Sequence, residues 1–374
     1  MKRILLLDID GVLVQPGGYR AALRATVKRF IGDYVIEEDV PVSMEKRGIS
    51  SEWDMAPLIV AAFWEGMFSR YYIDLLSDDV ALAAHNMKNL AKVMRPPEQL
   101  HIPAFKLMDG LYPVDAAYEQ GCFPSIPNGL RKNLMTESRD VYKSHTFRTF
   151  QQFTLGKKMF EETYQLPADA KREARSLLLT EDKANISAEI RERLRHERNS
   201  IAGFTARPSR PPREWDGSHR GYAPEAELGL ELAGLADIPL MSFGKLEFIA
   251  AQHGLNPATL MKPSPFHALA GIIAAWTGNE LSALNAVYEW HTSGKLNGKF
   301  NELPKSFELY VIEDTMGGVR ATRAAGEVLR EAGFGVSVHA LGLTSGIEQK
   351  AEAFRKADVP FFENWENLIA FGNL

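Results

Sequence analysis

Two aspartates near the amino terminus, Asp8 and Asp10, interrupt and end a run of apolar residues. A carboxylate in such a place can act as a nucleophile, transfer a proton or bind a metal ion. Two carboxylates only two residues apart repel each other, and burying them without a countercharge is costly. A divalent cation would remove that cost, and hard oxygen ligands favour magnesium. The ordinary alternative is a turn aspartate followed by a helix cap.

Two later segments carry groups that could bind phosphate. Residues 203–207 (GFTAR) combine the hydroxyl of Thr205 with backbone N–H groups that could hold phosphate oxygens. Residues 259–265 (TLMKPSP) place Lys262 just before a predicted helix. An ammonium is a compact positive charge that suits a phosphate oxyanion.

A second acidic pair, Glu313 and Asp314, ends another apolar run within residues 311–318 (VIEDTMGG). These carboxylates could join Asp8 in holding a metal ion. Taken singly, each group has an ordinary explanation: a turn hydroxyl, a solvated lysine, or an acidic pair that balances a helix dipole. Their joint occurrence in this order favours a phosphoryl-transfer site, because linked motifs are more specific than one.

The segments around these groups show the pattern of a parallel sheet, which would bring the groups together. Residues 4–9 are apolar except for Asp8, as in a strand buried on both faces. Further strands are expected at residues 201–204, 238–243, 307–312 and 335–343, alternating with helices at residues 225–236, 245–252, 266–277, 281–292, 319–332 and 348–357. Such alternation predicts a parallel sheet, and ligands gather at the carboxyl ends of its strands.

About 190 residues of mostly helical sequence separate the first expected strand from the second. Apolar residues recur there at helical spacing, as in Leu23, Val27, Phe30 and Ile31 and in Phe147, Phe150 and Phe153. Residues 181–198 are polar and indicate an exposed helix. The chain, at 374 residues, is long enough for two domains. We expect a Rossmann-like α/β core, residues 1–15 and 197–374, with a large helical domain, residues 16–196, inserted after the first strand.

The order and wording of the four groups resemble the signature motifs of the haloacid dehalogenase superfamily. The resemblance covers about residues 1–14 and 200–374. One branch of that superfamily carries a helical cap inserted at the same place, although this insertion is larger than a simple cap. The resemblance implies that Asp8 is the nucleophile and Asp10 the general acid/base. Members that cleave carbon–halogen bonds generally lack the second aspartate, so Asp10 favours phosphoryl transfer over dehalogenation.

The resemblance also implies roles for the remaining motif residues. Thr205 and the N–H of Ala206 would hold the transferred phosphoryl oxygens, and Lys262 would balance the charge on Asp8. A Mg²⁺ ion would be held by the carboxylates of Asp8 and Asp314 and the backbone carbonyl of Asp10, with Glu313 close by.

The substrate-binding residues are less clearly marked. Arg207 opens an unusual segment, residues 207–213 (RPSRPPR). This segment is either an exposed loop with solvated arginines or a place from which Arg207 or Arg210 reaches an anionic substrate group. In the helical domain, Trp53 could stack on a substrate ring, or it could pack between helices.

Composition narrows the class of protein. The formal net charge of −5 does not suit a protein that binds nucleic acid over its whole surface. A single cysteine, Cys122, cannot form an intramolecular disulfide and fits a reducing compartment. The first residues resemble the start of a signal peptide until Asp8 and Asp10 interrupt them, and no stretch approaches the ~20 apolar residues of a membrane span. We expect a cytoplasmic protein without a membrane partner.

These observations together predict a phosphomonoester hydrolase with Mg²⁺ as cofactor, acting on a small phosphorylated metabolite. A phosphomutase would have nearly the same motifs. A binding or scaffold module could keep the fold without catalysis. Nucleic-acid end processing is disfavoured by the net charge, although the arginines between residues 191 and 220 keep it open. The sequence leaves the substrate and the oligomeric state undetermined.

Overall fold

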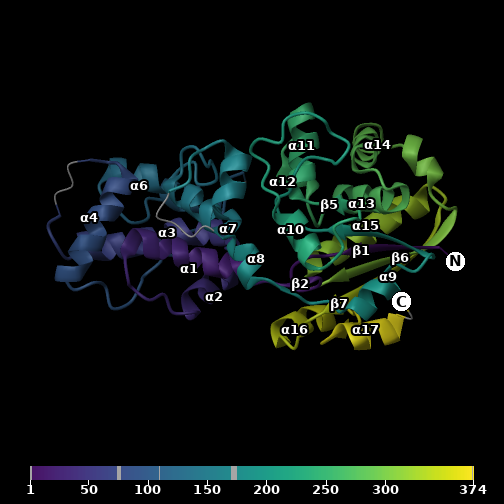
Figure 1. Ribbon diagram of the computed structural model, residues 1–374, viewed down its shortest axis with the longest axis horizontal. Coiled ribbons are helices and arrows are strands. Elements are labelled where there is room, and N and C mark those ends of the chain that lie inside the picture. Colours follow the sequence, from purple (N-terminus) through teal and green to yellow (C-terminus); the bar gives the residue numbers. More distant parts are fainter. Residues whose placement is uncertain (1, 74–76, 109, 170–174, 373) are drawn as a thin grey trace. The chain divides into compact units, whose positions relative to one another are not determined.

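The computed structural model describes residues 2–73, 77–108, 110–169, 175–372 and 374. The chain forms two compact units (Figure 1). An α/β unit consists of Met1–Pro16 and Asp182–Leu374, and a helical unit consists of Gly17–Glu181. Residues 182–196, which we expected in the helical domain, pack with the α/β unit.

A six-stranded sheet in the order β5-β4-β1-β6-β7-β8 forms the centre of the α/β unit. Neighbouring strands pair in parallel, which confirms the predicted parallel α/β sheet. After β5 the chain crosses β1 to the opposite side of the sheet, and ligands bind at such switch points in sheets of this class. The strands are β1 (Arg3–Leu7), β4 (Asn199–Phe204), β5 (Leu240–Met241), β6 (Ser306–Glu313), β7 (Gly335–Leu343) and β8 (Phe361–Phe362), of which β8 was not expected.

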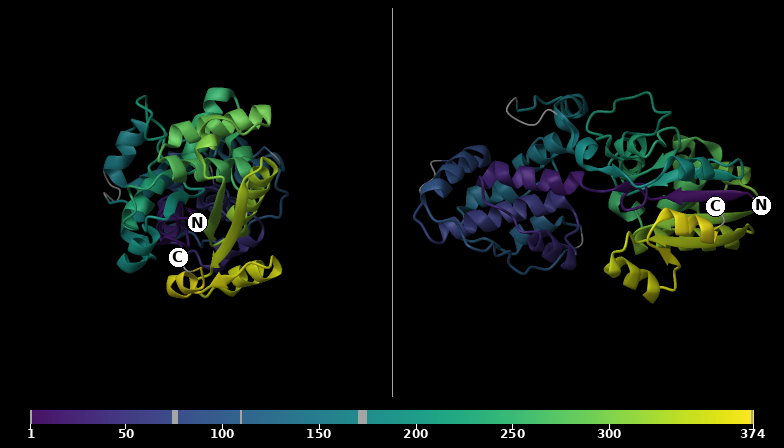
Figure 2. Two further views of the ribbon diagram at one scale, coloured as in Figure 1. Left: turned by 90° about the vertical axis from the view of Figure 1, so that its right-hand side faces the viewer. Right: turned by 60° about the horizontal axis from the view of Figure 1, so that its bottom comes forward.

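Hydrophobic layers cover both faces of the sheet, which explains the continuous apolar run of its first strand. Ile4 and Leu6 belong to one layer, and Leu5 and Leu7 to the other. Figure 1 shows α13 and α15 on one side of the strands and α17 on the other, and Figure 2 shows the same layers from two further directions. The first layer includes α11 (Phe243–His253), α13 (Pro265–Thr277), α14 (Glu280–Ser293) and α15 (Met316–Glu331); the second includes α9 (Ala188–Leu194), α10 (Glu225–Leu232) and α17 (Trp365–Gly372). Shorter or peripheral elements are α12 (Pro257–Leu260), η1 (Gly298–Glu302) and α16 (Glu348–Lys356).

The helical unit has its own hydrophobic core. The apolar stripe that begins with Leu23 and ends with Ile31 lies on α1 and is buried, as expected. Helix α3 is apolar on nearly every side because neighbouring helices enclose it. Among the described residues, no helix combines the length and apolarity that crossing a bilayer requires. The helices are α1 (Gly18–Ile31), α2 (Asp39–Lys46), α3 (Glu52–Phe68), α4 (Val80–Val93), α5 (Pro113–Glu119), α6 (Asn128–Met135), α7 (His145–Tyr164) and α8 (Leu177–Glu181).

Two short strands mark the places where the chain leaves the α/β unit and returns to it. β2 (Val14–Gln15) and β3 (Lys183–Ala184) pair in antiparallel fashion. The side-chain amide of Asn185 donates to the carbonyl oxygens of Gly11 (3.4 Å) and Val12 (3.1 Å). The outgoing and returning chains are therefore tied to each other next to the first motif.

The single exposed helix predicted for residues 181–198 is wrong. The chain passes from α8 through β3, and a new helix, α9, begins after Ser187, whose hydroxyl accepts the N–H of Ile190 at 3.2 Å. Ile190 and Leu194 of α9 are buried against the sheet. Four-residue spacing of these apolar side chains marks a helix with one buried face, which the many charged residues around them concealed.

Candidate active site

Three carboxylates meet at the carboxyl edge of the sheet, beside the switch point. Asp8 follows β1, and its N–H donates to the carbonyl of Ile312 on β6 at 3.0 Å. Glu313 ends β6 and Asp314 follows it, so the parallel pairing of the two strands brings these residues together. One carboxylate oxygen from each of Asp8, Glu313 and Asp314 lies within 4.8 Å of the other two. All three side chains are buried.

Lys262 lies between two of these carboxylates. Its Nζ is 2.7 Å from Glu313 Oε1 and 3.2 Å from Asp8 Oδ1. The same Nζ lies 4.6 Å from the ring centroid of Phe204. Burial alone would lower the pKa of Lys262, but Asp8 and Glu313 raise it above its usual value. The lysine therefore stays charged and fixes the direction of the Asp8 side chain.

His267 supports Lys262 from the first turn of α13 and was not singled out from the sequence. Its Nδ1 accepts the backbone N–H of Lys262 at 3.4 Å, and its Nε2 lies 3.2 Å from the carbonyl oxygen of Met241. These partners assign the proton to Nε2. Burial and the charge of Lys262 lower the pKa of His267 to about 3. The ring is therefore a neutral support near pH 7 and does not serve as a base.

The surroundings of the acidic pair, Glu313 and Asp314, disfavour the ionised form of both side chains. Burial and repulsion from Asp8 raise the pKa of Glu313 well above its usual value and raise that of Asp314 to about 6. Lys350 on α16 opposes this effect, because its Nζ lies 2.6 Å from Asp314 Oδ2. Lys350 could not be found from the sequence, since nothing in a helix of mixed charge marks the one lysine that reaches a site 36 residues away.

Two glycines allow the backbone to approach these carboxylates. Gly11 has a φ of +72°, and a Cβ there would lie 2.4 Å from Asp314 Oδ2. A Cβ on Gly318, in the first turn of α15, would lie 1.7 Å from Glu313 Oε1. Gly11 of the first motif and Gly318 of the last are therefore required by the space that the carboxylates occupy.

Asp10 pairs with Arg207. The guanidinium donates from Nε to Asp10 Oδ2 at 2.9 Å and from Nη2 to Asp10 Oδ1 at 2.5 Å, and Nη2 also lies 2.9 Å from Asp182 Oδ2. The side chains of Arg207 and Asp182 are 2% and 1% exposed, whereas that of Asp10 is 31% exposed. The solvated arginine considered from the sequence is wrong for Arg207, although Arg210 is exposed.

Thr205 and Ala206 follow β4 at the same edge of the sheet. The N–H of Thr205 donates to the carbonyl of Met241 at 3.0 Å, and its hydroxyl oxygen accepts the N–H of Arg207 at 3.2 Å. The hydroxyl still has its own proton to donate, and Ala206 is exposed. These two residues have the groups that a phosphate oxygen would need.

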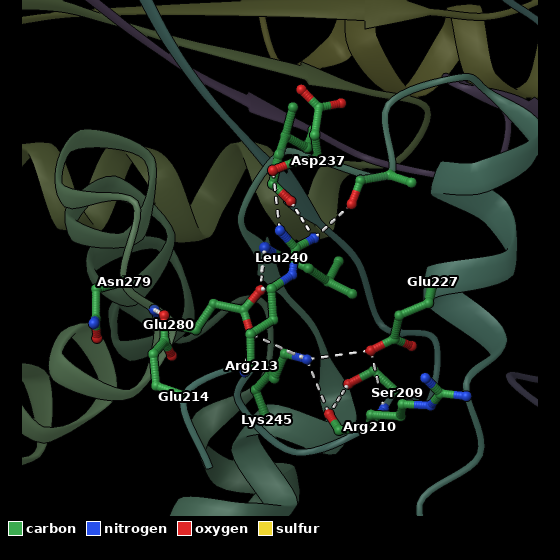
Figure 3. A network of polar contacts seen from close by, with 12 residues as sticks. Ser209, Arg210, Arg213, Glu214, Glu227, Asp237, Leu240, Lys245, Asn279 and Glu280 are labelled. Atoms are coloured by element: carbon green, nitrogen blue, oxygen red, sulfur yellow. Dashed lines mark hydrogen bonds and ion pairs between the residues drawn. The ribbon is translucent and has the colours of Figure 1, made fainter. Parts of the chain in front are cut away.

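The proline- and arginine-rich segment after Thr205 is held by a buried network around Lys245 of α11 (Figure 3). Lys245 Nζ donates to the carbonyl oxygens of Arg210 (3.0 Å) and Pro211 (3.1 Å). It also lies 3.2 Å from Glu227 Oε1 and 3.3 Å from Glu280 Oε2. The backbone of residues 207–213 is therefore held in place by the buried Lys245 side chain, which the sequence did not predict.

Trp53 lies in the helical unit, at the start of α3. Its ring contacts Phe147 and Phe150 of α7, with centroids 5.6 and 6.5 Å away, and Arg139 lies 5.2 Å from the ring centroid. These contacts give Trp53 a packing role within its unit. The helical unit also contains a cavity of about 730 Å³ between α1 and α4, which includes none of the motif residues.

The site has two more carboxyl groups than cationic side chains. The carboxyl groups are those of Asp8, Asp10, Asp182, Glu313 and Asp314, and the cations are Lys262, Arg207 and Lys350. An all-oxygen donor set with more carboxyl groups than cations fits a hard divalent cation such as Mg²⁺.

The sequence matches no protein-family model, and no curated protein matches it closely enough to count as a relative.

Proposed function

We propose that this protein is a Mg²⁺-dependent phosphomonoester hydrolase of the haloacid dehalogenase type that acts on a small phosphorylated metabolite. The supporting observation is the convergence of Asp8, Lys262, Glu313 and Asp314 at the switch point of a parallel sheet. Structural ion-pair networks also occur in proteins, but this one combines a potential nucleophile with more carboxyl groups than cationic side chains.

In the first step, a carboxylate oxygen of Asp8 attacks phosphorus, and the bond between phosphorus and the leaving oxygen breaks. Lys262 orients Asp8 and offsets the negative charge that accumulates as the carboxylate meets the phosphoryl group. Thr205 and the N–H of Ala206 are suited to donate to the phosphoryl oxygens. The product of this step is an aspartyl-phosphate on Asp8.

Asp10 provides the proton transfers. As the acid it gives a proton to the leaving oxygen, and as the carboxylate it then takes a proton from water. That water attacks phosphorus, the bond to Asp8 breaks, and inorganic phosphate leaves. Proton transfer by a positioned group is worth about 10²–10⁴-fold in rate.

The metal ion would be held by Asp8 and Asp314, with Glu313 beside them and the backbone carbonyl of Asp10 completing the protein ligands. When bound, Mg²⁺ would supply positive charge to the phosphoryl oxygens and to the nucleophile. Asp314 would exchange part of its contact with Lys350 for the ion.

The helical unit would serve as the cap of such an enzyme and would provide the contacts that select the substrate. A large cap favours a small substrate that can be enclosed. Trp53 stays a candidate for stacking on a substrate ring, although its contacts within the unit favour a packing role.

The test is phosphate release from a panel of small phosphate esters, with and without Mg²⁺, by the wild-type protein and by Asp8→Asn. Release should require Mg²⁺ and should vanish in Asp8→Asn. A hydroxylamine-sensitive phosphoryl label on the protein should disappear in the same variant, because it marks an acyl phosphate. Asp216→Asn, a change at an exposed aspartate outside the site, is the matched control and should keep full activity.

Absence of release from every ester by folded wild-type protein would contradict hydrolysis. If the protein is instead labelled by a bisphosphate and interconverts monophosphates, it is a phosphomutase. Folded protein that binds Mg²⁺ but neither hydrolyses esters nor becomes labelled would be a binding module. Binding to nucleic acid that weakens steeply with salt would favour end processing.

A further inference from the structure

We propose that Asp182 and Arg207 are positioning residues for Asp10, so that the three form a triad controlling the water-activating half of the reaction. This inference rests on the proposed function. It gives a role to two buried charged residues, Asp182 and Arg207, that the basic mechanism does not use.

The contacts within the triad are stronger than those of a surface ion pair. Arg207 holds both oxygens of Asp10 through two N–H groups of its planar fork, an arrangement that fixes orientation as well as charge. Asp182 holds the same guanidinium at 2.9 Å. A buried guanidinium with a single, partly exposed partner would be poorly compensated, and Asp182 supplies the second negative charge.

The exposure of the three residues indicates which of them is free to act. Arg207 and Asp182 are almost fully enclosed, whereas the Asp10 side chain is 31% exposed. The exposed part of the Asp10 carboxylate can therefore meet a substrate while Arg207 still holds both of its oxygens. The backbone of Arg207 is also fixed, because its N–H donates to Thr205 Oγ1 and its carbonyl accepts the N–H of Phe243.

The pairing gives the Asp10 carboxylate a fixed direction, because Arg207 donates to both of its oxygens. Taking a proton from water requires a carboxylate oxygen placed within hydrogen-bond reach of that water. The triad should therefore matter most when the aspartyl-phosphate is hydrolysed. It should matter little when Asp8 displaces a leaving group that needs no proton.

Asp182 lies where the chain returns from the helical unit. Asp182 is the first residue of the α/β unit after the helical unit and stands immediately before β3. Asp10 precedes β2, the strand that pairs with β3. Arg207 thus links the acid/base residue to the beginning of the returning strand.

p-Nitrophenyl phosphate separates the two halves of the reaction, because p-nitrophenolate leaves without a proton. In rapid mixing with Mg²⁺, the first turnover gives a burst of p-nitrophenol, and later turnovers report hydrolysis of the aspartyl-phosphate. Asp182→Asn and Arg207→Lys should keep the burst rate and lose about 10–100-fold in steady-state turnover. The pH dependence of turnover should change in Asp182→Asn, and Arg207→Lys should lose less than Arg207→Met because it retains the charge.

Arg198→Lys is the matched control, since Arg198 is an exposed arginine of the same α/β unit to which no site role is assigned, and it should leave burst and turnover unchanged. Equal loss of burst and turnover in Asp182→Asn would show a merely structural role and overturn the proposal. Unchanged turnover would do the same. If the Arg207 variants fail to fold, the isosteric Asp182→Asn decides alone. Wild-type protein inert towards every ester would overturn the proposed function and this inference together, whereas an active wild type with an unaffected triad variant overturns only the inference.

Discussion

Lys350 places its ammonium 2.6 Å from Asp314 Oδ2, on the carboxylate that we propose as a metal ligand. The two residues lie in different elements, α16 and the turn after β6. The protein thus supplies its own positive charge to Asp314. A bound Mg²⁺ ion would compete with the Lys350 ammonium for this carboxylate.

Replacing Lys350 with methionine should lower the free energy of unfolding of the metal-free protein and should increase its affinity for Mg²⁺. The substitution leaves a buried carboxylate without its partner, which costs about 1–3 kcal/mol. Mg²⁺ should restore this loss because it no longer competes with an ammonium. Urea unfolding with and without Mg²⁺ measures both effects. Lys356→Met, on an exposed lysine of the same helix, should change neither, and an unaltered Mg²⁺ affinity in Lys350→Met would refute the competition.

Alanine at Gly318 should destabilise the site, although alanine normally improves a helix by up to about 1 kcal/mol. Its Cβ would lie 1.7 Å from Glu313 Oε1 and would push this carboxylate away from Lys262. Gly317 is the matched control, because a Cβ there meets nothing closer than 3.7 Å. Thermal unfolding should show a lower midpoint for Gly318→Ala, and an equal or higher one for Gly317→Ala. Equal midpoints for the two variants would mean that Glu313 adapts without cost.

The stability of the metal-free protein should depend on Asp314 in a predictable direction. The pKa of Asp314 is raised from 3.8 to about 6, so the folded state binds this proton more tightly than the unfolded state. The contribution of Asp314 to the free energy of unfolding therefore falls as pH rises through about 4 to 6. His267 acts in the opposite direction, because its lowered pKa makes stability rise with pH over part of the same range. The stability difference between wild type and Asp314→Asn isolates the first effect. The free energy of unfolding of the wild type should fall, relative to that of Asp314→Asn, by about 2–3 kcal/mol between pH 4 and pH 7.

Saturating Mg²⁺ should flatten this pH dependence, since a bound cation favours the ionised carboxylate. A wild-type minus Asp314→Asn stability difference that stays constant from pH 4 to pH 7 without Mg²⁺ would contradict the raised pKa of Asp314. A difference that varies with pH as strongly with Mg²⁺ as without it would contradict binding of Mg²⁺ to this carboxylate.

Lys245→Met should be strongly destabilising, by about 3–5 kcal/mol, because Glu227 loses its cationic partner and the enclosed Glu280 keeps only Arg213. Burial already raises the pKa of Glu227, and Glu280 is fully enclosed. Lys295→Met, at an exposed lysine of the same unit, should change the unfolding free energy by less than about 0.5 kcal/mol. Proteolysis within residues 207–213 should accelerate in Lys245→Met, because that segment loses its anchor. A loss below about 1 kcal/mol would mean that the network is dispensable.

The parallel sheet was predictable because its long strands contain apolar runs separated by helical patterns, and because Asp8, Thr205 and Asp314 directly follow β1, β4 and β6. β7 was expected at its observed bounds, and β6 within one residue of each end. The strands β2, β3 and β8 have two residues each, too few to show any periodicity. Nothing local distinguishes them from loops.

The partners within the site were less predictable than the motifs. Arg207 is 197 residues from Asp10 and 25 from Asp182, and its burial depends on where α10 and the returning chain pack. Its neighbours in sequence are prolines and arginines, which indicate an exposed loop. Lys350 and His267 were missed for the same reason: their roles depend on tertiary contacts and leave no pattern in the sequence around them.

The ends of the helical unit lie next to each other: a Cβ on Gly17 would come within 2.5 Å of the carbonyl oxygen of Glu181. The strands β2 and β3 pair in antiparallel fashion just outside these ends. In the topology of the α/β unit, the whole helical unit therefore takes the place of the turn of a β-hairpin. The entropy of closing a very long loop is thus removed once the helical unit has folded on itself. A helical unit of a different length could therefore stand between β2 and β3 without altering the strand order of the sheet.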